Sequence, residues 1–277
     1  MKVSQHIHSL KIPFKLTISP EITIDRFVNC YIIEGKKITL IDTGVSGSEK
    51  IIFDYLKTIG RKPSDITQVL LTHTHPDHIG ALKTIKDETG CKVGVHKEEK
   101  DWVEDIEKQF HSRPVPSFHN LVIGSCKTDF LLAEDDVIDL GNELTIKVIH
   151  TPGHSAGSVT FHVMPDNAFI CGDVIPVKND IPIYDNWQIS LKTLEKLENL
   201  VYPQYLLSSW DSVKEGGDVE TAISNGFEVI YAVHQAWLDV HKNYSDIEEL
   251  SKAILDKLRL PSKFVNPLFV RGIKSHC

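Results

Sequence analysis

The segment LLTHTHPDHIGAL, from Leu70 to Leu82, gathers four metal-binding side chains directly after an apolar run: His73, His75, Asp77 and His78. A strand needs none of them, and the start of a helix needs at most one capping residue. His73 and His75 are two residues apart, so an extended segment presents both on one side, and the turn that follows can bring the next two to the same point. Imidazole nitrogens suit zinc, iron or manganese, and a carboxylate among them favours a hydrolytic centre over a structural one.

The pattern of apolar residues around this segment predicts strands and helices in two successive blocks. In the first block we expect strands at 3–8, 14–18, 28–33, 38–41, 66–72 and 91–96, helices at 48–60, 79–89 and 97–110, and a loop at 111–120. In the second we expect an antiparallel meander from 136, a helix at 190–200, a strand at 204–210 and helices at 219–241 and 246–258. This order indicates an α/β fold, a four-layer αββα sandwich of two mixed β-sheets with flanking helices. The sandwich is expected over residues 1–218, with residues 219–277 as a C-terminal helical extension packed on it.

Composition narrows the range of partners and compartments. The formal net charge of -8 argues against a nucleic-acid or acidic-membrane surface. Five scattered cysteines without a CxxC pair support neither a thiolate zinc site nor a disulfide framework. The first residues lack the apolar core of a targeting signal, and no apolar run approaches the roughly 18 residues of a membrane span. We therefore expect a cytoplasmic protein that acts on a small molecule, with homodimer formation left open.

Together with three later motifs, the HxHxDH pattern resembles the metallo-β-lactamase superfamily over about residues 29–211. The other motifs are LIDTG with Asp42, TPGHSAGS with His154, and ICGDVI with Asp173. The first motif is highly specific, whereas the GD pair alone would carry no weight; their order and separations make the combination strong. The resemblance implies the same αββα sandwich, with the ligands on loops at one edge of the two sheets.

The resemblance also implies a site for two divalent metal ions, most readily Zn²⁺, with Fe or Mn as alternatives. It assigns His73, His75 and His154 to one ion, has Asp77 and His78 begin the second site, and makes Asp173 the bridge. Asp42 would stand behind the ligands and hold an imidazole in the required tautomer, a role worth about 10–100-fold in affinity or activity.

One position departs from the family pattern. The family usually closes the second site with a histidine in a GH pair after a late strand, and this chain has Trp210 there, within YLLSSWDSV. Either Asp211 supplies an oxygen ligand instead, or the second site is weak or empty and Trp210 walls the pocket. Asp211 as the cap of a turn is the plain structural alternative.

The resemblance implies a hydrolase in which a metal-bound hydroxide attacks an ester, thioester, lactone or phosphodiester-type substrate, with Asp77 orienting the nucleophile and taking its proton. The segment HSRPVPSFHN offers Arg113 and His119 to an anionic substrate, although a solvent-facing loop explains it equally well. The C-terminal helices resemble the extension of glyoxalase II-type thioesterases without a matching motif.

Two alternatives stay open. One is a mononuclear-iron oxidoreductase resembling persulfide dioxygenases, which would use His73, His154 and Asp173 on a single iron. The other is a metal-binding protein without turnover.

Overall fold

The first of two β-sheets contains six strands in sequence order. The computed structural model describes residues 1–19, 22–262 and 265–277. The strands of this sheet are β1 (Ile7–Ser19), β2 (Ile22–Glu34), β3 (Ile38–Ile41), β4 (Ile66–Leu70), β5 (Lys92–His96) and β6 (Phe130–Leu132). Strands β1 to β3 pair antiparallel, and β3 to β6 pair parallel, so the sheet is mixed.

The second sheet also contains six strands and is also mixed. Its strands are β7 (Val137–Gly141), β8 (Leu144–His150), β9 (Val159–Met164), β10 (Ala168–Gly172), β11 (Tyr205–Ser208) and β12 (Lys214–Glu215). Strands β10 and β11 pair parallel and the remaining neighbours pair antiparallel.

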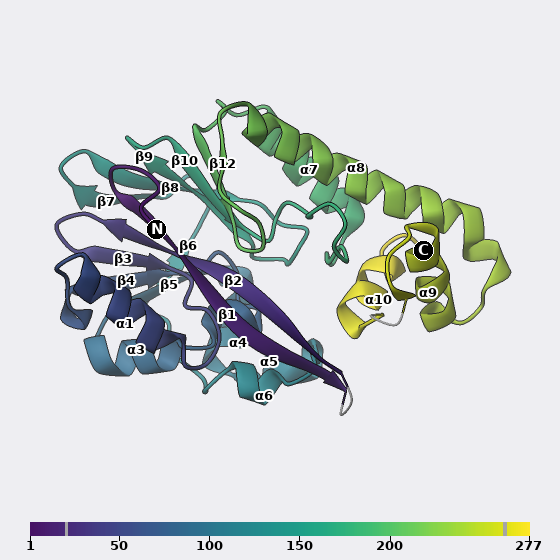
Figure 1. Ribbon diagram of the computed structural model, residues 1–277, viewed down its shortest axis with the longest axis horizontal. Helices are drawn as coiled ribbons and strands as arrows, with labels where there is room; N and C mark the ends of the chain where they lie inside the picture. Colours follow the sequence, from purple (N-terminus) through teal and green to yellow (C-terminus); the bar gives the residue numbers. More distant parts are fainter. Residues whose placement is uncertain (20–21, 263–264) are drawn as a thin grey trace.

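Helices cover the outer face of each sheet (Figure 1). Beside the first sheet lie α1 (Ser48–Thr58), α2 (Pro76–Ile79), α3 (Leu82–Thr89), α4 (Lys100–Glu104), α5 (Ile106–Ser112) and α6 (Phe118–Leu121). The second half of the chain supplies α7 (Trp187–Glu198), α8 (Gly217–Val240), α9 (Ile247–Lys257) and α10 (Pro267–Lys274). Short 3₁₀ turns occur at Pro63–Asp65, Lys97–Glu99 and His241–Asn243.

Three apolar clusters show how these layers are held together. The central cluster lies between the sheets, where Tyr31 and Leu70 of the first share a core with Phe161 and Ile170 of the second. A second cluster joins the first sheet to its helices. The third joins the second sheet to α7 through α10, and Phe269 of α10 lies in it. The expected αββα sandwich is therefore confirmed.

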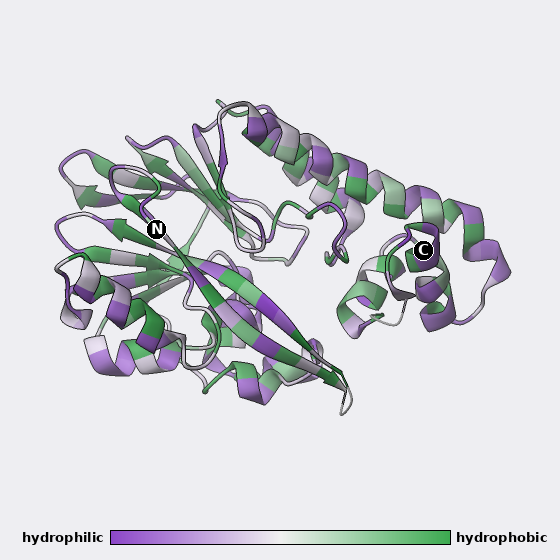
Figure 2. Ribbon diagram, viewed as in Figure 1, coloured by the Kyte–Doolittle hydropathy of each residue, from purple (hydrophilic) through white to green (hydrophobic). Residues whose placement is uncertain are grey.

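The N-terminal hairpin is longer than the sequence suggested. The segments expected at 3–8 and 14–18 form parts of one continuous strand, β1, which pairs with β2 over its length. Pro13 is tolerated inside it because β1 is the edge strand, where every second N–H points away from β2 and takes no part in the ladder. The hairpin extends beyond the sandwich (Figure 1), and apolar residues alternate with polar ones along it (Figure 2).

Other differences are local. The helix expected over 97–110 is interrupted at Asp105, whose backbone is extended and whose carboxylate caps α5 by accepting from the N–H groups of Glu107 and Lys108. The loop expected over 111–120 contains the start of α6, and neither β6 nor α10 was expected. Among the described residues, none of the helices has the length and apolar character needed to cross a membrane.

Candidate metal centre

The loops that leave β4, β8 and β10 bring the predicted ligands to one edge of the sandwich. His73 and His75 follow the buried strand β4, and α2 begins directly afterwards with Asp77 and His78 in its single turn. His154 lies between β8 and β9, and Asp173 follows β10. Residues far apart in the sequence are therefore gathered by strand ends from both sheets.

A first group of ligand atoms comprises those of His73, His75, His154 and Asp173, which all lie within 4.8 Å of one another. His154 Nε2 is 2.8 Å from His75 Nδ1. Asp173 Oδ2 is 3.5 Å from His154 Nε2 and 3.8 Å from His73 Nε2. Three imidazoles and one carboxylate at these separations form a compact set of donors for one divalent ion.

A second group shares Asp173 and adds Asp77 and His78. His78 Nε2 lies 3.5 Å from Asp77 Oδ2 and 3.4 Å from Asp173 Oδ1. The two oxygens of Asp173 thus face different groups, as a carboxylate that bridges two ions would. This second group offers one imidazole and two carboxylates, one donor residue fewer than the first.

Several of these buried atoms have no partner within the described part of the chain. His73 Nε2, His78 Nε2, Asp77 Oδ2 and Asp173 Oδ1 make no hydrogen bond there. An unsatisfied buried polar atom costs about 1–3 kcal/mol, so leaving four in one cluster would be expensive. Divalent metal ions would satisfy all of them, and the donor set fits zinc, iron or manganese.

Hydrogen bonds behind the cluster fix two imidazole tautomers. His154 Nδ1 donates to the carbonyl of Ile183 at 2.8 Å, and a carbonyl can only accept, so Nδ1 carries the proton. His78 Nδ1 lies 2.9 Å from Asp42 Oδ2, and a carboxylate likewise demands a donor. In both rings Nε2 is therefore the nitrogen that faces the cluster. Asp42 also accepts from the N–H and hydroxyl of Thr72, so the structure places it behind the ligands.

Burial and charge set the protonation states. Burial lowers the pKa of His73, His75 and His154, and so favours the neutral imidazole that binds metals. Burial raises the pKa of Asp77 to about 6. The pKa of Asp173 is held well below its usual range, because the attraction of neighbouring imidazoles, His78 above all, outweighs its burial.

Gly172 allows Asp173 to reach the cluster. Its φ is +55°, and a Cβ at this position would lie 2.6 Å from Thr72 Oγ1. A side chain here would push β10 away from the end of β4, which carries His73. The glycine of the GD pair therefore has a packing role at the point where the two sheets meet.

Two predicted site residues are not brought to the cluster. The Asp211 carboxylate pairs with Lys214 at 3.0 Å and accepts from the N–H of Ser212 at 2.7 Å, so it stabilises its own turn. His119 is exposed and pairs with Glu107 at 2.9 Å, and it does not line the cavity described below. The sequence around Asp211 does not indicate its ion pair with Lys214. The segment 111–120 likewise does not indicate the ion pair of His119 with Glu107.

Trp210 stands at the position where the family usually has its last histidine. Its indole Nε1 donates to Asp173 Oδ2 at 2.9 Å, and the guanidinium of Arg26 lies over its ring at 4.3 Å. Indole nitrogen is a donor only and has no lone pair for a metal. Trp210 therefore supplies a hydrogen bond to Asp173 Oδ2 and no ligand for the second group.

Glu99 is a buried site residue that the sequence did not indicate. Oε2 accepts from the backbone N–H and the hydroxyl of Thr74, at 2.6 and 2.8 Å. Oε1 accepts from the hydroxyl of Ser155 and from the N–H of Gly157. One carboxylate thus joins the loop of His73 and His75 to the loop of His154. In the sequence it lies within the charged run KEEK, which is typical of a solvent-facing helix start.

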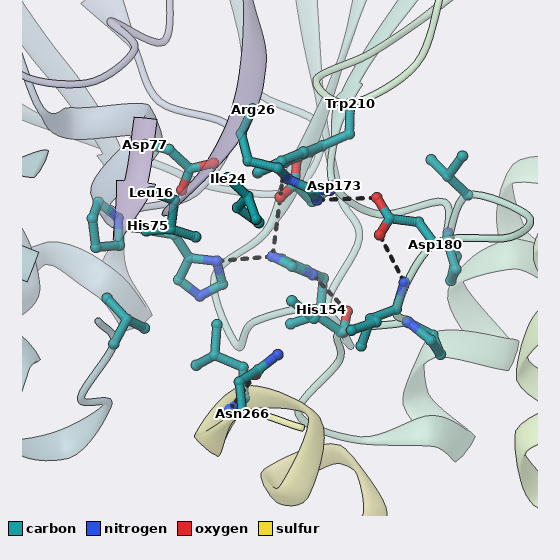
Figure 3. A pocket seen from close by; sticks show the side chains of 18 of the residues that line it. Leu16, Ile24, Arg26, His75, Asp77, His154, Asp173, Asp180, Trp210 and Asn266 are labelled. Atoms are coloured by element: carbon teal, nitrogen blue, oxygen red, sulfur yellow. Dashed lines mark hydrogen bonds and ion pairs between the residues drawn. The ribbon is translucent and has the colours of Figure 1, made fainter. Parts of the chain in front are cut away.

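A cavity of about 470 Å³ opens over the cluster. Its floor includes His75, Asp77, His154 and Asp173, and Figure 3 shows the labelled His75, His154 and Asp173 linked by their short contacts. The walls come from the β1–β2 hairpin, from the segment after β10 and from the chain before and within α10. Volumes of this size suit a small molecule.

Comparison with known proteins agrees with this geometry. The family model of the metallo-beta-lactamase superfamily matches residues 23–206. A probable metallo-hydrolase of Bacillus subtilis is 30% identical over 145 residues, which is 52% of this chain and 64% of that protein. A probable metallo-hydrolase of Methanocaldococcus jannaschii is 30% identical over 179 residues, which is 62% of this chain and 81% of that protein. The match therefore spans less than two thirds of the Bacillus relative and most of the Methanocaldococcus one.

Solved structures show the same fold. A metallo-beta-lactamase family protein of Thermus thermophilus superposes with a TM-score of 0.76 at 20% identity, covering 98% of this chain and 91% of that one. A subclass B3 metallo-beta-lactamase of Bradyrhizobium japonicum superposes with a TM-score of 0.60 at 22% identity, covering 82% and 97%. At such identities the likeness extends to the fold alone.

Proposed function

The chain belongs to the metallo-beta-lactamase superfamily, and on this basis we propose that it hydrolyses a small-molecule ester, thioester, lactone or phosphodiester with the help of divalent metal. The observation that carries the proposal is the set of unpartnered buried atoms of His73, His78, Asp77 and Asp173, which lie close together beneath a cavity that Asp77 and Asp173 line. Core packing does not require such a set, whereas a metal-dependent hydrolase does.

We assign one ion to His73, His75, His154 and Asp173, and a more weakly held second ion to Asp77, His78 and Asp173. Zinc is the preferred identity because imidazole and carboxylate together suit it. Bound at these positions, the metal supplies Lewis acidity and a water molecule whose pKa is lowered towards neutrality.

The residues of the chain then have separate tasks. Asp77 lines the cavity, its unpartnered Oδ2 lies beside His78, and it is the group that orients the attacking water and takes its proton. Asp42 keeps the proton of His78 on Nδ1, and the Ile183 carbonyl does the same for His154. The apolar cavity walls exclude bulk water, which strengthens these electrostatic interactions.

Hydrolysis of a panel of thioesters, lactones and phosphodiesters, before and after chelation, tests the proposal. We expect at least one class to be hydrolysed, the activity to be lost on chelation, and added zinc or manganese to restore it. Asp77→Asn should lower kcat/KM by about 10²–10⁴-fold. The matched control is Asp87→Asn, because Asp87 is exposed and pairs with Lys83 on the surface of α3.

Two results would count against the hydrolase. Hydrolysis that is unaffected by chelation would contradict the role of metal. A single bound iron with oxygen consumption on a persulfide would support the oxidoreductase alternative, which the three-residue second group and the hydrogen bond from Trp210 to Asp173 make the strongest competitor.

A further inference from the structure

We propose that Arg113 forms an anion-binding subsite in the cavity, and that the ligand of this cavity is a small molecule with an apolar body and a carboxylate. Describing that ligand as the substrate rests on the hydrolase proposed above. The subsite itself rests on the environment of Arg113, which is independent of the reaction.

Arg113 is a buried guanidinium without hydrogen bonds. It follows α5, and only 3% of the residue is exposed. None of its three side-chain nitrogens makes a hydrogen bond within the described part of the chain. A guanidinium has five N–H donors in a planar fork, and burying them unpaired costs more than a neutral group would. The environment therefore lacks an acceptor that fits the fork.

None of the carboxylates around Arg113 gives it a hydrogen bond. Asp185 Oδ1 forms an ion pair with Arg113 Nη1 at 3.7 Å, beyond hydrogen-bonding distance, and a closer one with Arg271 Nε at 2.9 Å, and it makes no hydrogen bond to either. Glu99 and Asp77 also act electrostatically on Arg113, but Glu99 already accepts from the two ligand loops and Asp77 belongs to the metal group. Two guanidiniums thus share one carboxylate, that of Asp185, so one positive charge remains for a further anion to balance.

The position of Arg113 places that anion beside the reaction centre. Arg113 lines the same cavity as His75, Asp77 and His154. The planar fork of arginine matches a carboxylate in a bidentate arrangement, which fixes orientation as well as adding affinity. A ligand held there would be aligned with respect to the metal-ligand cluster.

The remaining walls of the cavity are mainly apolar. Leu16 and Ile24 come from the hairpin, Ile175 and Ile181 from the segment after β10, and Leu268 from α10. Figure 3 shows Leu16 and Ile24 beside the metal-ligand residues. Such walls favour an apolar body about the size of a short acyl chain or a ring system.

Arg26, a second arginine of this cavity, has a different environment. Its Nη2 donates to Asp180 at 3.0 Å, and its guanidinium lies over the ring of Trp210. Asp180 balances the charge of Arg26, and the two contacts fix its position. Arg26 therefore links the hairpin to the segment after β10 in the cavity wall. The difference between the two arginines indicates that Arg113 is the group reserved for a ligand.

Isothermal titration calorimetry with octanoate, octanamide and butyrate tests the subsite directly. In protein treated with chelator, octanoate should bind about tenfold or more tightly than octanamide, because the amide lacks the charge. It should also bind more tightly than butyrate, because the longer chain buries more apolar surface. Because the chelator removes bound metal, coordination of the carboxylate to a metal ion cannot explain this preference for octanoate.

Variants of Arg113 identify the group responsible. Arg113→Met should remove the preference for octanoate over octanamide while leaving octanamide binding nearly unchanged. Arg113→Lys should keep part of the preference, since the charge stays and the fork is lost. Arg61→Met is the matched control, because Arg61 pairs with Glu34 at 3.0 Å and does not line this cavity, and it should keep the full preference.

Three outcomes would overturn the proposal: equal affinity for octanoate and octanamide in the wild-type protein, a preference that survives Arg113→Met, or a preference that disappears on chelation. If Arg113→Met does not fold, as judged from thermal unfolding, the wild-type comparison and Arg113→Lys decide. Failure of the hydrolysis panel with octanoate preference retained would overturn the hydrolase and leave the subsite standing.

Discussion

At the scale of single residues, Glu99 has a structural role that the sequence does not indicate. Its carboxylate accepts four hydrogen bonds, two from Thr74 and one each from Ser155 and Gly157. These partners lie next to the metal-ligand histidines in the sequence, so Glu99 fixes the relative position of two loops. We treat it as a positioning residue, since it touches no ligand atom of the cluster.

Replacing Glu99 by Gln should weaken metal binding by about 10–100-fold, because the amide NH₂ turns one acceptor into a donor that faces other donors. It should also destabilise the fold by about 1–3 kcal/mol. Chelator competition measures the metal affinity, and chemical unfolding measures the stability. Glu98→Gln is the matched control, one residue earlier and exposed. Unchanged metal affinity in Glu99→Gln would show that the two loops hold their geometry without it.

Trp210 offers a test of how many metals the site holds. Trp210→His would place an imidazole where the present indole donates to Asp173, and we expect it to raise affinity for a second ion by at least tenfold. Trp210→Phe is the control, because it removes the N–H without adding a ligand. Metal titration after dialysis gives the number of ions per chain. The same second-ion affinity in both variants would contradict the assigned second site.

At the scale of elements, α10 is held in place by a stack of rings. The ring of His276, just after α10, lies parallel to that of Trp187 in α7 at 5.0 Å. His276 Nδ1 is 3.0 Å from His234 Nδ1 of α8, and its Nε2 is 2.9 Å from the hydroxyl of Tyr184. Burial lowers the pKa of His276 to about 4, so the folded protein keeps this ring neutral.

This stack predicts a loss of stability in mild acid. The folded pKa of His276 lies below the unfolded value of about 6.5, so its contribution is complete above pH 6.5 and is lost as the pH falls towards 4. Between pH 7 and pH 5 the difference should be about 1 kcal/mol after allowance for solvent screening. Unfolding by urea at both pH values, for the wild type and His276→Gln, measures it. The variant should show a shallower dependence than the wild type; equal slopes would refute the assignment.

The sequence predicts those elements whose signals are local. HxHxDH could be interpreted because its ligands are adjacent along the chain and follow an apolar strand, so placing one places the others. His154 and Asp173 could be added because TPGHSAGS and ICGDVI resemble the later motifs of the family and follow HxHxDH in the expected order. Helices with clear caps, such as α9 with Asp246, lie within one or two residues of their expected bounds.

What the sequence could not predict depends on tertiary contacts. The extent of β1 depends on its being an edge strand that tolerates Pro13. Asp211 lies next to the ligand position along the chain, yet it turns to Lys214, and only the fold shows which side of the turn it occupies. Arg113 lies in a proline-containing segment that suggests an exposed loop, but the chain around α5 buries it beneath the cavity.

At the scale of the whole molecule, the site depends on both halves of the chain. The first sheet supplies His73, His75, Asp77 and His78, and the second supplies His154 and Asp173. The C-terminal helices add a wall of the cavity while sharing an apolar cluster with the second sheet. We therefore propose that the sandwich and the extension act as one structural unit at the site.

Metal content of the full chain, purified without chelator, tests the central claim most directly. Inductively coupled plasma mass spectrometry should find at least one divalent ion per chain, a marked loss in His154→Ala, and no loss in Asp211→Ala. The His154 ring is a member of the first group, whereas the Asp211 carboxylate pairs with Lys214. A wild-type chain without metal that also takes none up, or full retention in His154→Ala, would contradict the account.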